Sequence, residues 1–338
     1  MTFNKVLLSW IVILIITTSI YLFWQLGDIN DVFNQSILIN VRLPRLLEAL
    51  LTGMILTVAG LIFQTVLNNA LADSFTLGLA SGATFGSGLA LFLGLTTLWI
   101  PVFSITFGSG LALFLGLTTL WIPVFSITFS LITLITVLVI TSVLSQGYPV
   151  RILILSGLMI GALFNSLLYF LILLKPRKLN TIANYLFGGF GDAEYSNVSI
   201  IAITFIIALF GIFIILNQLK LLQLGELKSQ SLGLNVQLIT YIALCIASMI
   251  TAINVAYVGI IGFIGMVIPQ LIRKWQWKQS LGRQLALNIV TGGQIMVMAD
   301  FIGSHILSPV QIPASIIIAL IGIPVLFYML ISQSKRLH

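Results

Sequence analysis

The segment "LLEALLTGMILTVAGLIFQTVL" fills residues 46–67 and carries a single charged side chain, Glu48. A helix of this length is about 33 Å long, which is enough to cross the hydrocarbon core of a bilayer. Ala49, Gly53 and Thr57 recur at every fourth residue, so small side chains form a ridge along one face of the predicted helix. Because such a ridge lets another membrane helix approach closely, we expect this span to pack inside a helical bundle.

Apolar segments of similar length recur along all 338 residues, of which 59% are hydrophobic and 7% are charged. These charges are too few to cover a soluble globule, so the composition excludes a soluble protein and predicts an all-α, polytopic membrane protein. With one copy of an internal repeat set aside, ten transmembrane helices are predicted. They cover residues 7–25, 46–67, 76–95, 124–144, 152–173, 198–216, 236–257, 262–275, 284–304 and 314–333.

The repeat is a tandem duplication of 22 residues, in which 85–106 and 107–128 are identical. Hydropathy alone would divide the uncharged tract 74–150 into three spans, which would invert the membrane orientation of every later span. Basic residues accumulate on the cytoplasmic side of membrane proteins. With ten spans and a cytoplasmic amino terminus, ten Lys and Arg residues lie on the cytoplasmic side and five on the outer side. With an eleventh span, only four lie on the cytoplasmic side and eleven lie outside. We therefore expect both termini to lie in the cytoplasm. We expect the extra copy to form a re-entrant hairpin or a hairpin that lies on the outer side, or to lengthen a pair of helices.

Several kinds of chemistry are excluded by the residues that the chain lacks. It has no G-x-x-x-x-G-K-[ST] phosphate loop, and its two histidines and single cysteine cannot form the usual metal sites. No enzyme, cofactor or metal centre is predicted. The net charge of +7 comes from basic residues at the ends of spans, which indicates orientation and not nucleic-acid binding. An intramembrane protease that uses Ser81 or Ser87 with His305 is a distant alternative.

Glycines and polar residues within the spans indicate a conduit. Gly82 and Gly86 belong to a glycine cluster that weakens a helix, and irregular backbone at membrane depth is typical of transport pathways. We expect these glycines, together with Asn254 and Gln294, to line the pathway. The alternative is that each polar side chain bonds to a neighbouring helix.

Charged residues at the spans suggest two further roles. Arg42 and Arg45 precede a span on the predicted outer side, where guanidinium groups suit either the carboxylates of an acidic partner protein or lipid phosphate. Glu48 lies one turn after Arg45 and could pair with it, while Asp300 lies near the outer end of the ninth span. A second hypothesis is therefore an ion-coupled secondary transporter in which Glu48 and Asp300 titrate.

The chain resembles a known family in several places. The run "RLPRLLEALLTGMILTVAGLIFQTVLNNALADSFTLGLASGA" at 42–83 resembles the permease subunits of ABC importers for iron-siderophores, haem and cobalamin, the FecCD/cobalamin-type permease family. Further matching segments follow in the family's order. They are "GGFG" (188–191), "LGELKSQSLG" (224–233), "GFIGMVIPQLIR" (262–273), "AD" (299–300) and "IPASIIIALIGIPVLFYML" (312–330).

This resemblance implies a single transmembrane permease domain over 1–338, with ten helices, in the cell membrane. Two such subunits, identical or different, would enclose a central pathway above a dimer of cytoplasmic ATP-binding subunits. A substrate-binding protein would dock from outside, and membrane lipid would surround the pair. The implied function is uptake of an iron chelate, a ferric siderophore or haem, by ATP-driven alternating access.

The resemblance also implies roles for particular residues. Arg42 and Arg45 match outward arginines that meet glutamates of the binding protein. The segment 217–236 matches the coupling helices that enter a cleft of the ATPase. Within this coupling segment, the matched positions are Leu224, Gly225, Glu226, Ser231 and Gly233. The residues that match the family's cytoplasmic gate lie elsewhere in the chain and are Asn69, Leu71, Tyr148 and Pro149.

The chain departs from the family pattern at a few of these sites. Two prolines of the pattern are replaced by Ala70 and Ser74, which predicts a more flexible gate loop. Gln270 stands where the family often has a histidine, and Gln311 stands where it often has a glutamate. Ser304 stands where the family has an outward arginine. Because that arginine is absent, we expect weaker docking or docking that depends on Arg42 and Arg45.

Overall fold

The computed structural model describes residues 3–28, 30–74, 76–93, 121–144, 150–174, 176, 187–275, 279–307 and 310–334. All regular secondary structure in these ranges is helical. The contacts divide the chain into two compact units. The first comprises the described residues of Met1–Asp73, Gly188–Ile250 and Ile261–His338, and the second those of Ser74–Phe187 and Thr251–Ile260.

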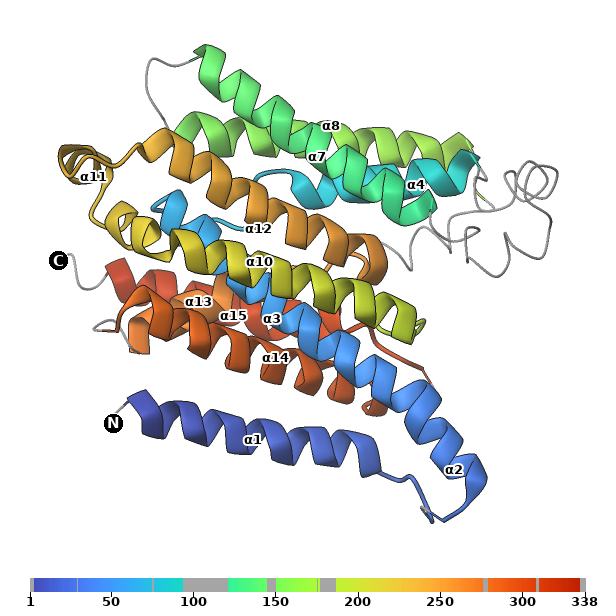
Figure 1. The fold of residues 1–338 in the computed structure, drawn as a ribbon. Helices are drawn as coiled ribbons and strands as arrows, with labels where there is room; N and C mark the ends of the chain where they lie inside the picture. The colour runs from blue at the N-terminus through green and yellow to red at the C-terminus, as the bar shows by residue number, and fades with distance from the viewer. Residues whose placement is uncertain are drawn as a thin grey trace. The chain divides into compact units, whose positions relative to one another are not determined.

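The first unit holds most of the helices (Figure 1). They are α1 (Phe3–Phe23), α2 (Val32–Ile37), the π-helical turn η1 (Leu38–Arg42), α3 (Leu43–Val66), α10 (Tyr195–Leu222), α11 (Glu226–Ser231), most of α12 (Val236–Val258), α13 (Ile264–Trp275), α14 (Leu281–His305) and α15 (Ala314–Ser334). The second unit holds α4 (Leu79–Leu93), α7 (Trp121–Leu144), α8 (Val150–Leu174) and the last residues of α12.

The prediction of an all-α, polytopic membrane protein is confirmed. Each of the ten predicted spans coincides with one helix, in order α1, α3, α4, α7, α8, α10, α12, α13, α14 and α15. Within the described ranges, seven stretches are long and apolar enough to cross a membrane. They are Phe3–Phe23, Val32–Val66, Pro123–Val143, Ile152–Leu174, Tyr195–Leu222, Val236–Val258 and Leu281–His305. The short span expected at 262–275 is α13, with 12 residues.

Helix α3 is the centre of the first unit, where it packs against α10, α13 and α14. The predicted ridge of small residues is confirmed, because a Cβ atom on Gly53 would lie 2.2 Å from the carbonyl oxygen of Gly292 in α14. Thr57 Oγ1, on the same ridge, donates to the carbonyl oxygen of Asn288, 2.9 Å away. Gly60 extends the ridge towards α13. Backbone therefore meets backbone along α3, which only small side chains permit.

In the second unit α4 packs against α7 and α8. Helix α4 ends in the first copy of the duplicated segment, at Leu93, and α7 begins in the second copy, at Trp121. The pair therefore uses the start of one copy and the end of the other. The predicted hairpin or helix extension of the extra copy falls on residues 94–120, which lie outside the described residues.

Candidate functional site

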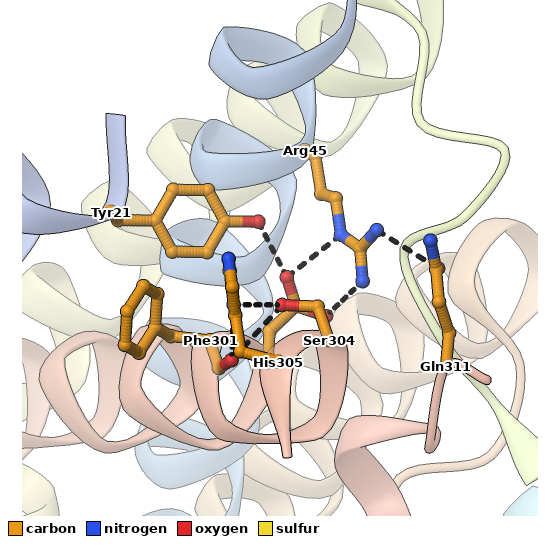
Figure 2. A network of polar contacts seen from close by, with 7 residues as sticks. Tyr21, Arg45, Phe301, Ser304, His305 and Gln311 are labelled. Carbon is orange, nitrogen blue, oxygen red and sulfur yellow. Dashed lines mark hydrogen bonds and ion pairs between the residues drawn. The ribbon is translucent and has the colours of Figure 1, made fainter. Parts of the chain in front are cut away.

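A buried ion pair joins α3 to α14. Arg45 donates from Nε to Asp300 Oδ2 and from Nη2 to Asp300 Oδ1, each over 2.8 Å, so the guanidinium binds the carboxylate as a fork (Figure 2). Tyr21 donates its hydroxyl to Asp300 Oδ2 at 2.6 Å, and Arg45 Nη1 donates to Gln311 Oε1 at 3.1 Å. We call Tyr21, Arg45, Asp300 and Gln311 the Arg45–Asp300 network.

The network connects four parts of the first unit. Tyr21 lies in the last turn of α1, Arg45 in the first turn of α3, Asp300 near the end of α14, and Gln311 just before α15. The Asp300 side chain is 1% exposed and that of Arg45 is 15% exposed. Removing one partner of such a buried pair costs about 3–5 kcal/mol, whereas an exposed pair contributes about 0–1 kcal/mol. The network therefore holds the ends of these helices together.

Arg42 lies one turn earlier and has a different partner. Its Nη1 donates to the carbonyl oxygens of Leu22 and Trp24, each at 2.7 Å, and so caps the carboxyl end of α1. Nε and Nη2 of Arg42 make no hydrogen bond to any described residue. Because this edge of the guanidinium has parallel N–H groups, it can still bind a carboxylate as a fork.

Glu48 does not pair with Arg45, and the hypothesis that it does is wrong. The carboxylate partner of Arg45 is Asp300, which lies 255 positions away and could not be chosen from spacing. Glu48 is 2% exposed, and its Oε1 has no hydrogen-bond partner within the described part of the chain. The charged groups that act on it, Asp192, Glu194 and Asp300, are all acidic.

The helix that carries both arginines contains an irregular turn. The π-helical turn η1 ends at Arg42, and the hydroxyl of Tyr195 donates to the carbonyl oxygen of Ile39 within it at 2.6 Å. A π-turn is rare and often occurs at functional positions. The sequence analysis did not predict this turn, and its contact with Tyr195 joins residues 156 positions apart.

The predicted coupling segment is a short helix between two turns. Gly225 and Gly233 bracket α11 with φ values of 92° and 82°, a backbone conformation that favours glycine. Leu224, Glu226 and Ser231 are exposed around it. The predicted coupling residues therefore lie in this short helix and in the turns on either side of it.

Three residues of this segment were not predicted. Ser229 is fully buried and donates to the carbonyl oxygens of Leu221 and Gly225, at 2.7 and 2.8 Å, which ties α11 to the end of α10. Leu227 and Leu232 are 82% and 60% exposed. Two leucines among polar residues in a loop are a signal that could have identified this apolar surface.

Two of the four predicted gate residues, Asn69 and Leu71, follow the end of α3, where Asn69 Oδ1 accepts a hydrogen bond from the backbone N–H of Leu71 at 3.0 Å. The Gln270 side chain donates to the carbonyl oxygen of Ala70. Ala70 and Gln270 both depart from the family pattern, and they contact each other. The amide of Gln270 thus holds the loop in which Ala70 replaces the family's proline. Tyr148 and Pro149 lie outside the described residues.

The predicted pathway residues lie at helix contacts in both units. A Cβ on Gly82 would meet Thr133 Oγ1 at 2.1 Å, and one on Gly86 would meet the carbonyl oxygen of Phe125 at 2.2 Å, so these glycines pack α4 against α7. Gln294 is fully buried and accepts a hydrogen bond from Thr17 of α1 at 3.0 Å. The alternative of a bond to a neighbouring helix therefore holds for Gln294.

Asn254, the fourth predicted pathway residue, is also buried. It lies in α12, in the second unit, whereas Gln294 lies in the first. The four residues are thus divided between the units, and their role in a pathway stays a prediction.

Comparison with known proteins gives consistent matches. The model of the FecCD transport family matches residues 5–332. The uncharacterized ABC transporter permease protein YvrB of Bacillus subtilis (strain 168) is 32% identical over 318 residues, which cover 93% of this chain and 85% of the relative. The Fe(3+) dicitrate transport system permease protein FecD of Escherichia coli (strain K12) is 29% identical over 91% of this chain and 88% of its own length. A solved inward-facing structure, described as a metal-chelate type ABC transporter, superposes with a TM-score of 0.81 and 26% identity, over 98% of this chain and 99% of that chain.

Proposed function

The chain belongs to the FecCD transport family, and from this premise we propose that its cargo is an iron chelate, either a ferric siderophore or haem. It is a multi-pass membrane protein and a permease subunit of an ABC importer, and it is not an enzyme. The observation that carries the choice of cargo is the similarity to FecD, whose name gives an iron(III) chelate. The likeness to a metal-chelate type transporter supports the same class of cargo.

The coupling segment supports an ATP-driven mechanism. Leu227 and Leu232 present an apolar surface beside the exposed Glu226 and Ser231, which suits insertion into a cleft of a partner ATPase. Because Ser229 ties α11 to α10, a displacement of α11 would be passed to a long helix of the first unit. ATP-driven closure of the two ATPase subunits would then alternate access to the pathway, with Asn69, Leu71, Tyr148 and Pro149 at the cytoplasmic gate.

The topology follows from the same assignment. The ten helices would cross the membrane with both termini in the cytoplasm, and the two compact units would together form one permease domain. Apolar side chains that are exposed along α10, among them Ile206, Phe210 and Phe213, suit contact with lipid or with a second permease subunit. A substrate-binding protein would deliver the cargo to the outer side.

Reconstitution tests this function. Proteoliposomes that contain the permease and its ATPase should take up a radioactive ferric chelate or haem only with ATP and the substrate-binding protein. The ion-coupled alternative, in which Glu48 and Asp300 titrate, predicts uptake without any ATPase. Repeating the assay with residues 107–128 deleted shows whether the duplicated copy assists or hinders transport. Uptake by the permease alone, driven by an ion gradient, would contradict the proposed function.

Arg42→Glu should strongly weaken docking of the binding protein. Arg42 keeps a free N–H fork, and reversing its charge would set a carboxylate against the carboxylate of the partner. We expect the affinity to fall by about 30-fold or more, because the loss of such a charge pair costs 2 kcal/mol or more. Binding of the labelled protein to the permease–ATPase complex measures this.

Asn40→Glu serves as the control for Arg42→Glu, because Asn40 is exposed in the same turn and bonds only to Ser36 in the described structure. It adds a negative charge without removing a guanidinium. Co-purification of the ATPase should be unchanged in both variants. Docking of Arg42→Glu with wild-type affinity would show that this arginine has been assigned wrongly.

A further inference from the structure

We propose that Asp300 is a positioning residue for docking, which holds the guanidinium of Arg45 at the surface and away from the buried Glu48. This inference rests on the proposed function, in which a substrate-binding protein docks on the outer side, and on the expectation from the family resemblance that Arg45 binds one of its carboxylates. It adds to that function two acids of this chain, Asp300 and Glu48, that compete for one arginine.

The geometry of the ion pair leaves Arg45 able to bind a second carboxylate. A guanidinium has five N–H donors. Asp300 and Gln311 accept three of them, so one donor on Nη1 and one on Nη2 remain without a bond to the described residues. Asp300 lies on the buried side of the group and Gln311 on the exposed side. A carboxylate from outside would therefore approach the end of the guanidinium, opposite Cδ.

Glu48 is the competing acid. It follows Arg45 by three residues on α3, and residues at this spacing are neighbours on one face of a helix. Its Oε1 is buried and has no hydrogen-bond partner in the described structure. A guanidinium would supply the missing hydrogen bond. Without Asp300, Arg45 would therefore turn towards Glu48.

That movement would remove Arg45 from the surface. The Glu48 side chain is 2% exposed, so an arginine that binds it is drawn into the protein. Asp300 prevents this because it offers both oxygens to the fork from a neighbouring helix, and Tyr21 fixes one of those oxygens with its hydroxyl. Asp300 then determines which way Arg45 points. Glu48 determines how much docking affinity is lost when Asp300 is removed.

The test is a double-mutant experiment on the permease–ATPase complex in lipid nanodiscs. The probe is a purified, labelled substrate-binding protein chosen because it binds the wild-type complex. Asp300→Asn should weaken docking about tenfold, because the charge that binds Arg45 is lost. Glu48→Gln alone should dock like wild type. The double variant Asp300→Asn, Glu48→Gln should recover to within about threefold of wild type, because no acid remains to draw Arg45 inward.

Two controls separate positioning from folding. Tyr21→Phe removes a hydrogen bond to Asp300 but leaves the charged fork on Arg45, so it should lower the thermal unfolding temperature and weaken docking less than Asp300→Asn does. Co-purification of the ATPase reports the integrity of every variant. If the double variant docks as weakly as Asp300→Asn, the competition with Glu48 is refuted, because a merely structural role predicts no recovery.

A further variant distinguishes this inference from the function on which it rests. Arg45→Gln should dock about tenfold more weakly than wild type. If Arg45→Gln docks normally, Arg45 does not bind the substrate-binding protein. The assignment of Arg45 to the docking site is then refuted together with this inference. If Arg45→Gln is weak but Asp300→Asn docks like wild type, only the positioning role of Asp300 is overturned.

Discussion

Gly60→Ala will prevent the first unit from folding normally, although it adds a single methyl group. A Cβ atom on Gly60 would lie 1.8 Å from the carbonyl oxygen of Gly265 and 2.7 Å from its Cα. Both are backbone atoms of α13, so no side-chain rotation can relieve the overlap. Helices α3 and α13 would have to separate, which also lengthens the bond from Gln64 Nε2 to the carbonyl oxygen of Met266, now 3.0 Å.

The expected cost of Gly60→Ala is large compared with the stability of a protein. Overpacking a well-packed core costs about 1–3 kcal/mol, and a backbone collision lies at or above the upper end. Native proteins are stable by only about 5–15 kcal/mol. We expect a clear fall in the yield of monodisperse protein on size-exclusion chromatography, and a lower thermal unfolding temperature in detergent.

Gly191→Ala is the matched control for Gly60→Ala. Among the described residues, no atom outside Gly191 and its two chain neighbours lies within 4 Å of a Cβ built on Gly191, and its φ is not in the left-handed region. The same chemical change should therefore leave yield and unfolding temperature as in wild type. A Gly60→Ala protein that unfolds at the wild-type temperature would show that α3 and α13 do not approach as closely as described.

Leu227→Asp will separate the permease from its ATPase while leaving the permease folded. Leu227 is 82% exposed and contributes little to the core, so the fold does not depend on it. In a cleft of the ATPase, however, an aspartate would lose its contact with water, which is costly for an unpaired charge. Losing a central apolar anchor of an interface costs about 2 kcal/mol or more, which corresponds to about a 30-fold loss of affinity. Co-purification of the ATPase and ATP-driven uptake should both fall.

Gln230→Asp distinguishes the loss of the leucine from the added charge. Gln230 is exposed in the same short helix, and within the described residues its side chain donates only to Glu226 Oε1, at 3.3 Å. This variant gains the same charge but keeps the apolar surface, so it should retain the ATPase. Equal losses in both variants would indicate a charge effect on α11, and normal co-purification by Leu227→Asp would refute the coupling assignment.

The fold was more predictable than the partners of the functional side chains. All ten expected spans coincide with helices, because an apolar segment of bilayer length is a local property of the chain. The ridge at Ala49, Gly53 and Thr57 was predicted for the same reason, since its spacing is that of one helix face. The neighbour of the ridge, α14, was not, because small residues show that a helix approaches but not which one.

Arg42 and Arg45 illustrate the limit of prediction from the sequence. Their position at the start of a span was evident from the chain, and a carboxylate was expected as the ligand of Arg45. The nearest acid along the helix, Glu48, was considered as its partner, yet Asp300 of α14 occupies the fork. Position in a helix does not decide between two acids when one of them comes from another helix.

By itself, the sequence determined that this protein is a polytopic helical permease, where its helices lie, and which of its segments resemble docking and coupling elements. Those properties depend on hydropathy, charge distribution and short motifs, all of which are local. Only the tertiary structure decided that Arg45 binds Asp300 and Gln311, 255 and 266 positions away, that Arg42 caps α1, and that Ser229 ties α11 to α10. Such contacts form because helix packing brings distant side chains within hydrogen-bonding distance, and no local pattern of residues records that packing.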